Sequence, residues 1–160
     1  MDQKKLEELI VYLGGHPQVE NLGLTKLWKL IYFVDSEAKR DGGDSVTGSE
    51  FIKYDHGPVP SRGQKHLSKL VKSGEVKTSQ RTLGDKVLNE VISSRPTNPS
   101  AFSRREIGII DSVCERFGQE SAFNLSKLSH KEPAWHYADK MQKLSPSLMS
   151  YGWEEDPEGL

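Results

Sequence analysis

Apolar side chains recur at helical spacing in the first part of the chain. The first such segment carries four of them on one face: Leu6, Leu9, Ile10 and Leu13. Asp2 can cap this helix and Gly14-Gly15 can end it. The opposite face is expected to be solvent-exposed: Lys4, Glu7 and Glu8. A second helix is predicted over about 25–40, and because its centre, LWKLIYFV, is apolar almost all round, we expect it to be the hub of the core.

Two residues of the second helix break its pattern. Asp35 projects from the apolar arc, and because an unpaired buried carboxylate is costly, we expect it to accept hydrogen bonds from backbone N–H groups of a nearby loop. Phe33 projects from the other arc, which otherwise holds polar residues: Lys26, Lys29, Ser36 and Arg40. Phe33 therefore either packs under the N-terminal helix or contacts a partner.

Two prolines interrupt the chain after a short strand. Residues 51–54 are predicted to be this strand, and Gly57-Pro58-Val59-Pro60 follows. Because each proline lacks an N–H and fixes φ, this segment is predicted to be a corner and not the middle of a helix or sheet. A helix over 60–73 and a hairpin of strands 75–80 and 86–92 are predicted next.

The second half of the chain is predicted to be helical. Ser103 and Glu106 can form a capping box at the start of a helix that Gly118 ends. Shorter helices are predicted over 122–128 and 133–138.

The predicted elements define a fold class and a domain plan. The class is α+β and mainly helical, with about five to six helices around the central helix 25–40. A small antiparallel sheet or hairpin is expected over these ranges: 51–54, 75–80 and 86–92. Residues 1–145 are expected to form one domain, and residues 146–160 an acidic, aromatic tail.

Charge is distributed unevenly along the chain. The net charge is −1, yet residues 58–81 carry +5 and each flank carries −3. On the predicted helix 60–73 the basic residues form a stripe: Arg62, Lys65, His66, Lys69 and Lys72. A basic helix followed by a hairpin with Lys77 and Arg81 resembles a winged helix, so DNA binding is one interpretation. A solvated polar face is the other.

The sequence gives little support for an enzyme, a metal site or a cofactor. The five histidines lie in different segments without a partner at metal-binding spacing, and no glycine-rich phosphate motif is present. A hydrolase built on Asp35, His56 and His130 requires that these side chains converge in one pocket. The single cysteine, Cys114, falls on an apolar helix face and is expected in the core. No apolar run is long enough to span a membrane and the first residues are charged, so we expect a cytoplasmic protein.

Two stretches, KLWKLIYFVDSEAKRDGGDSVTGSEFIKYDHGPVP and LSKLSHKEPAWHYA, carry a resemblance to a known family. Four motifs occur in order: Tyr32 to Asp35, Thr47-Gly48, Gly57 to Pro60, and Ser129 to Trp135. Together they resemble the Panacea domain of SocA-like antitoxins over roughly residues 20–140.

The resemblance implies an antitoxin that neutralises a cognate toxin by direct contact, with no cofactor. It also implies a possible role as an adaptor that hands the toxin to a ClpXP-type protease. Some relatives carry a separate helix-turn-helix module that represses their own operon. Panacea-like sequence fills nearly all of this chain, which puts such self-repression in doubt.

The resemblance and the surface chemistry together give two sets of site residues. Those expected to contact a partner are Phe33, Tyr54, His56, Val59, Arg62, Lys65, Lys69 and Trp153. The motif residues expected to hold the structure are Asp35, Gly57, Pro58, Pro60, His130 and Trp135. The alternative for the proline corner is a purely structural role. The tail around Trp153 either contacts the toxin or a protease, covers a groove of its own domain, or is disordered.

Overall fold

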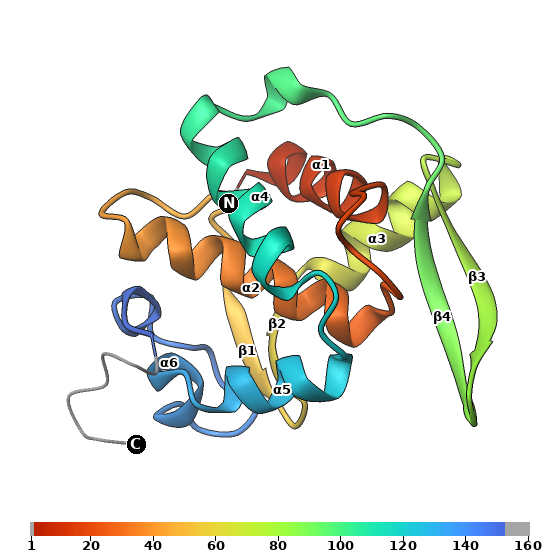
Figure 1. Ribbon diagram of the computed structural model, residues 1–160. Helices are drawn as coiled ribbons and strands as arrows, with labels where there is room; N and C mark the ends of the chain where they lie inside the picture. Colours follow the sequence, from red (N-terminus) through yellow and green to blue (C-terminus); the bar gives the residue numbers. More distant parts are fainter. Residues whose placement is uncertain (1, 153–160) are drawn as a thin grey trace.

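The structure, a computed structural model, describes residues 2–152 (Figure 1). Within these residues the helices are α1 Gln3–Gly14, α2 Leu24–Arg40, α3 Gly63–Lys72, α4 Arg104–Phe117, α5 Ala122–His130 and α6 Pro133–His136. Short 3-10 turns occupy Pro99–Ala101 and Leu148–Ser150. The strands are β1 Phe51–Tyr54, β2 Gly57–Pro60, β3 Val76–Leu83 and β4 Lys86–Ser93. The fold is therefore α+β and mainly helical, as the sequence predicted.

Helix α2 lies at the centre of the molecule and packs against α4, α5 and β2 (Figure 1). Its apolar residues, from Leu27 to Ala38, are buried, which confirms the prediction of a hub helix. Phe33 is 1% exposed, stacks on Phe117 of α4 with ring centroids 4.7 Å apart, and meets Tyr32 edge to face. The expectation that Phe33 contacts a partner is wrong, because its ring is part of the core.

The polar arc predicted for α2 does not face solvent. Lys26 and Lys29 are both buried, and their ammonium groups reach backbone carbonyls of distant segments. Lys26 donates to the carbonyls of Glu20 and Gly118, and Lys29 donates to that of Pro58. A lysine can be buried here because its long stem packs against apolar neighbours while its charge is hydrogen-bonded.

Helices α1 and α4 begin and end where the sequence indicated. The Asp2 side chain accepts from the Lys5 N–H, and Ser103 with Glu106 forms the expected capping box. Cys114 is fully buried on α4, as expected. One prediction for α1 is wrong: Glu8 is buried, because its carboxylate accepts hydrogen bonds from Arg95 and the segment that follows it.

The strands form two separate two-stranded antiparallel sheets in the described part of the chain. Strands β1 and β2 pair from Phe51↔Pro60 to Tyr54↔Gly57, so the segment expected to be a corner is itself a strand. Strands β3 and β4 pair over eight positions and extend to Leu83, beyond the predicted end at Gln80. This second hairpin projects from the side of the molecule (Figure 1). Helix α3 starts at Gly63, three residues later than predicted.

The C-terminal part of the described chain packs on the core. Residues 141–144 run beside β1, and Leu144 and Met149 are buried. Helix α5 continues to His130, two residues beyond its predicted end. Helix α6 ends at His136, two residues before its predicted end at Ala138. Of the predicted tail, residues 146–152 are described and belong to this packed segment, whereas residues 153–160, with Trp153, lie outside the described residues. No helix among the described residues is both long and apolar enough to span a membrane.

Candidate partner-binding surface

The β1–β2 hairpin accommodates two prolines because of its register. Phe51 and Lys53 stand opposite Pro60 and Pro58, and their backbone groups bond to segment 141–144 instead of to β2. In an antiparallel pair the residues alternate between those that bond across the ladder and those that point away from it. Pro58 and Pro60 therefore occupy the positions at which no N–H is needed.

The inner side of this hairpin is closely packed around Gly57. The Lys29 ammonium donates to the Pro58 carbonyl at 3.0 Å, and burial lowers the pKa of Lys29 to about 7. Gly57 has φ +120°, and an added Cβ would overlap the Lys29 side chain and Ser129 Oγ. A glycine is required here both by the backbone conformation and by the lack of space.

Trp135 supports the turn end of the hairpin. Its indole Nε1–H donates to the Tyr54 carbonyl at 3.2 Å, its ring stacks on His130 at 4.0 Å, and the Lys53 ammonium lies 4.2 Å from its ring centroid. Burial lowers the pKa of His130, and the nearby positive charge of Lys29 acts in the same direction. These contacts make Trp135 an anchor between α6 and the hairpin, the role expected for it.

Asp35 holds the loop that leads to β1. Its carboxylate accepts hydrogen bonds from the backbone N–H of Thr47 at 2.9 Å and from the Thr47 hydroxyl. Burial raises the pKa of Asp35 to about 6, although the bonds from Thr47 act in the opposite direction. Asp35 therefore accepts from a loop N–H, as the sequence predicted.

The outer side of the hairpin faces solvent. Ile52, Tyr54 and Val59 share this side, because Ile52 pairs with Val59 and Tyr54 is two residues further along β1. Tyr54 is 40% exposed, His56 is exposed on the turn and Val59 is half-buried. We call Tyr54, His56 and Val59 the hairpin surface. It combines a phenol ring, an imidazole and a valine that also packs against the core. The backbone that carries them is held by the contacts described above.

Two exposed residues near this surface were not expected from the sequence. Tyr137 is 44% exposed, and the carbonyls of its two neighbours, His136 and Ala138, accept from the Lys53 ammonium beside Tyr54. Met141 is 51% exposed and bonds through its N–H to the Lys53 carbonyl. It also adopts φ +64°, a conformation that is unusual for methionine. No periodicity in the sequence signals these positions, because both lie next to β1 only through tertiary contacts.

The basic stripe of α3 is largely exposed. Arg62, Lys65, Lys69 and Lys72 face solvent. His66, which the sequence placed in the stripe, is instead buried, and its Nδ1 lies 2.6 Å from the Glu7 carboxylate of α1. The Lys69 ammonium lies 3.2 Å from the same carboxylate oxygen. The stripe is therefore narrower than predicted.

The proposed hydrolase residues do not converge. Asp35 is fully buried against Thr47, whereas His56 is exposed on the β1–β2 turn, so the two do not share a pocket with His130. Across residues 2–152 there is also no group of three or more His, Cys, Asp or Glu side chains suited to a metal ion.

The four sequence motifs meet in pairs. Gly57 to Pro60 forms β2, and Ser129 to Trp135 packs beneath its turn. Asp35, which ends the first motif, accepts hydrogen bonds from Thr47 of the second. The family model described as "Antitoxin SocA-like, Panacea domain" matches residues 27–136. Neither the curated proteins nor the solved structures include a match to this chain. Because the family model covers more than half of the sequence, the chain belongs to the SocA-like antitoxin family with a Panacea domain.

Proposed function

We propose that this protein neutralises a cognate toxin in the cytoplasm by binding it through the hairpin surface. Membership of an antitoxin family supports a general antitoxin role. The observation that carries the finer proposal is Tyr54, a half-exposed aromatic residue whose own carbonyl is fixed by Trp135. Tyrosine is among the residues that most often dominate binding energy at protein interfaces.

Rigidity beneath the hairpin surface favours tight binding. Association loses free energy when loops and side chains become ordered, so a backbone that is already fixed retains more of the contact energy. In β1–β2 the fixed elements are the Lys29 bond to Pro58, the Trp135 bond to Tyr54 and the pairing of β1 with segment 141–144. The hairpin surface therefore has the properties of a preshaped binding patch.

The basic stripe contributes in a different way. Arg62 follows β2 directly, and Lys65 and Lys69 continue along α3. Exposed charges of this kind mainly raise the rate of encounter with an acidic partner and add little affinity. We therefore assign the stripe to the rim of the interface. We expect its contribution to the association rate to fall as the salt concentration rises.

Coexpression tests the proposal. The toxic product of the adjacent reading frame is expressed with this chain or with its Tyr54→Ala and His56→Ala double variant, and growth is followed. We expect growth with the wild type and arrest with the double variant, at equal antitoxin levels on a blot. The control is Leu83→Ala, which removes an exposed apolar side chain from the other hairpin and is expected to neutralise normally. Full neutralisation by the double variant would exclude the hairpin surface.

The same coexpression experiment distinguishes neutralisation by binding alone from delivery of the toxin to a ClpXP-type protease. If this chain acts as an adaptor, the toxin half-life shortens only in cells that contain the protease. If it acts by binding alone, neutralisation persists in cells without the protease. Deleting residues 153–160 tests the predicted tail contact and leaves the buried Met149 in place.

DNA binding is the second candidate, and one observation favours it. The exposed stripe of α3 is followed directly by the projecting β3–β4 hairpin, which carries Lys77 and Arg81 (Figure 1). If duplex DNA is the partner, log affinity should fall linearly with log salt, with a slope of about one unit per phosphate contacted. Affinity for the toxin should depend far less on salt, because no Lys, Arg, Asp or Glu side chain belongs to the hairpin surface.

A further inference from the structure

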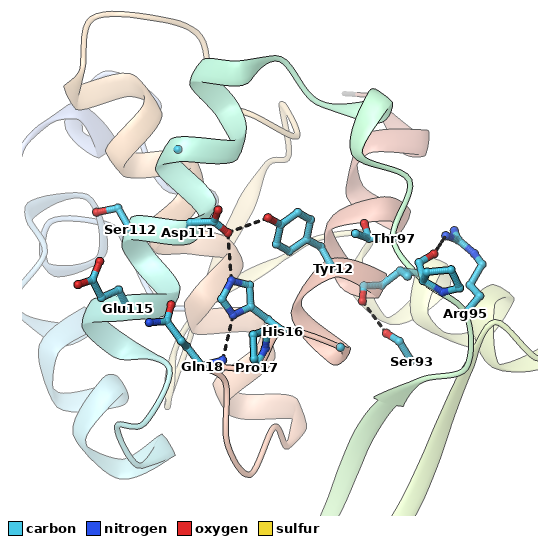
Figure 2. Close-up of a pocket in the computed structure, with 14 residues that line it drawn as sticks. Tyr12, His16, Pro17, Gln18, Ser93, Arg95, Thr97, Asp111, Ser112 and Glu115 are labelled. Atoms are coloured by element: carbon cyan, nitrogen blue, oxygen red, sulfur yellow. Dashed lines mark hydrogen bonds and ion pairs between the residues drawn. The ribbon is translucent and has the colours of Figure 1, made fainter.

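A pocket of about 690 Å³ lies between α1, α4 and residues 93–97, away from the hairpin surface (Figure 2). One wall is a single face of α4 formed by residues spaced three or four apart: Gly108, Asp111, Ser112 and Glu115. On the opposite side, the end of α1 supplies Tyr12 and the loop that follows it supplies His16. The volume is in the range of pockets that bind small ligands or a partner's side chain.

Asp111 is held in position for an occupant of this pocket. Its Oδ1 accepts a hydrogen bond from the Tyr12 hydroxyl at 2.7 Å and lies 3.0 Å from His16 Nε2 (Figure 2). The Gln18 N–H donates to His16 Nδ1, so the neutral imidazole carries its proton on Nε2 and donates it to Asp111. Burial, with the bond to Asp111, raises the pKa of Tyr12 to about 12, so the phenol remains a donor.

The second oxygen, Asp111 Oδ2, makes no hydrogen bond to any residue from 2 to 152, and the carboxylate is half exposed. Glu115 lies one helical turn further along α4 and forms no ion pair within the same residues. Like charges at this spacing destabilise a helix. The cation on the facing wall, Arg95, is already matched by Glu8 and Glu75. The pocket therefore presents negative charge without a counter-ion.

Gly108 leaves space in the α4 wall. It lies inside the helix and outside the left-handed region of φ, and an added Cβ would meet nothing within 4 Å. Glycine inside a helix is less stable than alanine, so neither the backbone nor the packing of this chain explains it. Space at this position widens the pocket beside Asp111.

We propose that this pocket binds a guanidinium group, presented as an arginine side chain by a protein partner. A guanidinium can donate a charge-assisted N–H bond to Asp111 Oδ2, since Oδ1 already accepts from Tyr12 and His16. Its planar frame carries further N–H donors for the Glu115 carboxylate one helical turn away. A metal ion fits less well, because no group of three suitable ligands exists among the described residues. The proposal does not depend on toxin binding by the hairpin surface, since the two sites share no residue.

A titration of the full-length protein with N-acetyl-L-argininamide, followed by amide NMR shifts, tests the site. We expect saturable shifts at Gly108, Asp111 and Ser112, with a dissociation constant on the order of millimolar, as suits one exposed charged contact. The citrulline analogue has the same shape without the charge and should cause no saturable shift there.

Two variants and one control separate this site from general charge effects. Asp111→Asn should weaken the argininamide about tenfold, the loss expected when a charged hydrogen-bond acceptor is removed. Gly108→Leu should abolish binding by filling the pocket and should keep or raise the Tm, since leucine favours the helix. Asp85→Asn removes the same charge from the exposed β3–β4 turn and should leave binding unchanged. Equal binding of the citrulline analogue, or undiminished binding by Asp111→Asn, would overturn the proposal.

Discussion

The β1–β2 and β3–β4 hairpins are both two-stranded antiparallel sheets, and they differ in what packs against them. In β1–β2, Phe51 is buried, Lys29 and Trp135 bond to the backbone, and segment 141–144 pairs with the outer edge of β1. In β3–β4, which is twice as long, the buried strand residues are Val76 and Val91.

The difference shows that length does not make a hairpin rigid. A two-stranded sheet alone is marginally stable in water, so its stability comes from the groups that cover it. The short hairpin is covered on one side and exposed on the other, whereas the long one packs on the core at Val76 and Val91 and is largely exposed along the rest of its length. We therefore expect β1–β2 to open only with global unfolding and β3–β4 to open locally at lower free energy.

The largest expected effect on stability comes from replacing the glycine at the turn end of a hairpin, Gly57 in β1–β2 or Gly84 in β3–β4. Gly57→Ala should lower the free energy of unfolding by about 4 kcal/mol, because it combines backbone strain with overlap against Lys29 and Ser129. Gly84→Ala should cost only about 1 kcal/mol, since φ is +60° but nothing lies within 4 Å. Urea denaturation measures both, and equal losses would refute the difference in packing.

The second effect is a pH dependence that belongs to β1–β2. Burial lowers the pKa of Lys29 to about 7 from its ordinary 10.5, so between these values the unfolded chain binds more protons than the folded one. The free energy of unfolding should therefore rise with pH, on the order of 2 kcal/mol between about pH 7 and 9.

Lys29→Met isolates this contribution from that of other titrating groups. The difference in unfolding free energy between wild type and Lys29→Met should grow with pH over the same range, measured by urea denaturation at each pH. A difference that does not change with pH would show that the Lys29 ammonium is not desolvated beneath the hairpin.

The smallest stability effect concerns the anchor of β3–β4. Val91→Ala removes two buried methyl groups and should lower the opening free energy of β3–β4 amides by about 1.5 kcal/mol. The matched change Val87→Ala, at a side chain 67% exposed, should change it by less than about 0.5 kcal/mol. Hydrogen exchange measures the amides of both hairpins in one experiment. If Val91→Ala lowered the protection of β1–β2 amides by a similar amount, the two hairpins would not open independently.

Local signals in the sequence predicted the helices because their determinants are local. Asp2 and the pair Ser103 and Glu106 cap backbone N–H groups within three residues, and the apolar face of α1 follows from spacing alone. The hub position of α2 followed from its apolar centre for the same reason. Element ends that depend on tertiary packing, such as the start of α3 at Gly63, were placed less well.

The errors arise where the partner is distant in sequence. Lys29 bonds to a carbonyl 29 residues away, so helical spacing could not show that this lysine is buried. His66 meets Glu7 59 residues away, and spacing alone assigned it to the basic stripe. Pro58 and Pro60 correctly excluded a central strand, yet an edge strand remained possible because the register of β1 decides which N–H groups are needed.

The candidate site was predicted in part. Sequence reasoning placed Tyr54, His56 and Val59 on a stiff exposed element, and the structure puts them at the surface of β1–β2. It did not find Tyr137 and Met141, because they approach β1 only through the fold of the C-terminal segment. Contact of any of these residues with a toxin remains the proposal to be tested.

Calorimetry of the purified protein with the proposed toxin, the product of a neighbouring reading frame that proves toxic when expressed alone, tests the central claim most directly. Tyr54→Ala should weaken binding about tenfold, or about 1.4 kcal/mol, as expected for a residue at the centre of an interface. Val87→Ala, on the solvated hairpin, should bind as the wild type does. Wild-type affinity in Tyr54→Ala together with a loss in Val87→Ala would contradict the account and move the interface to β3–β4.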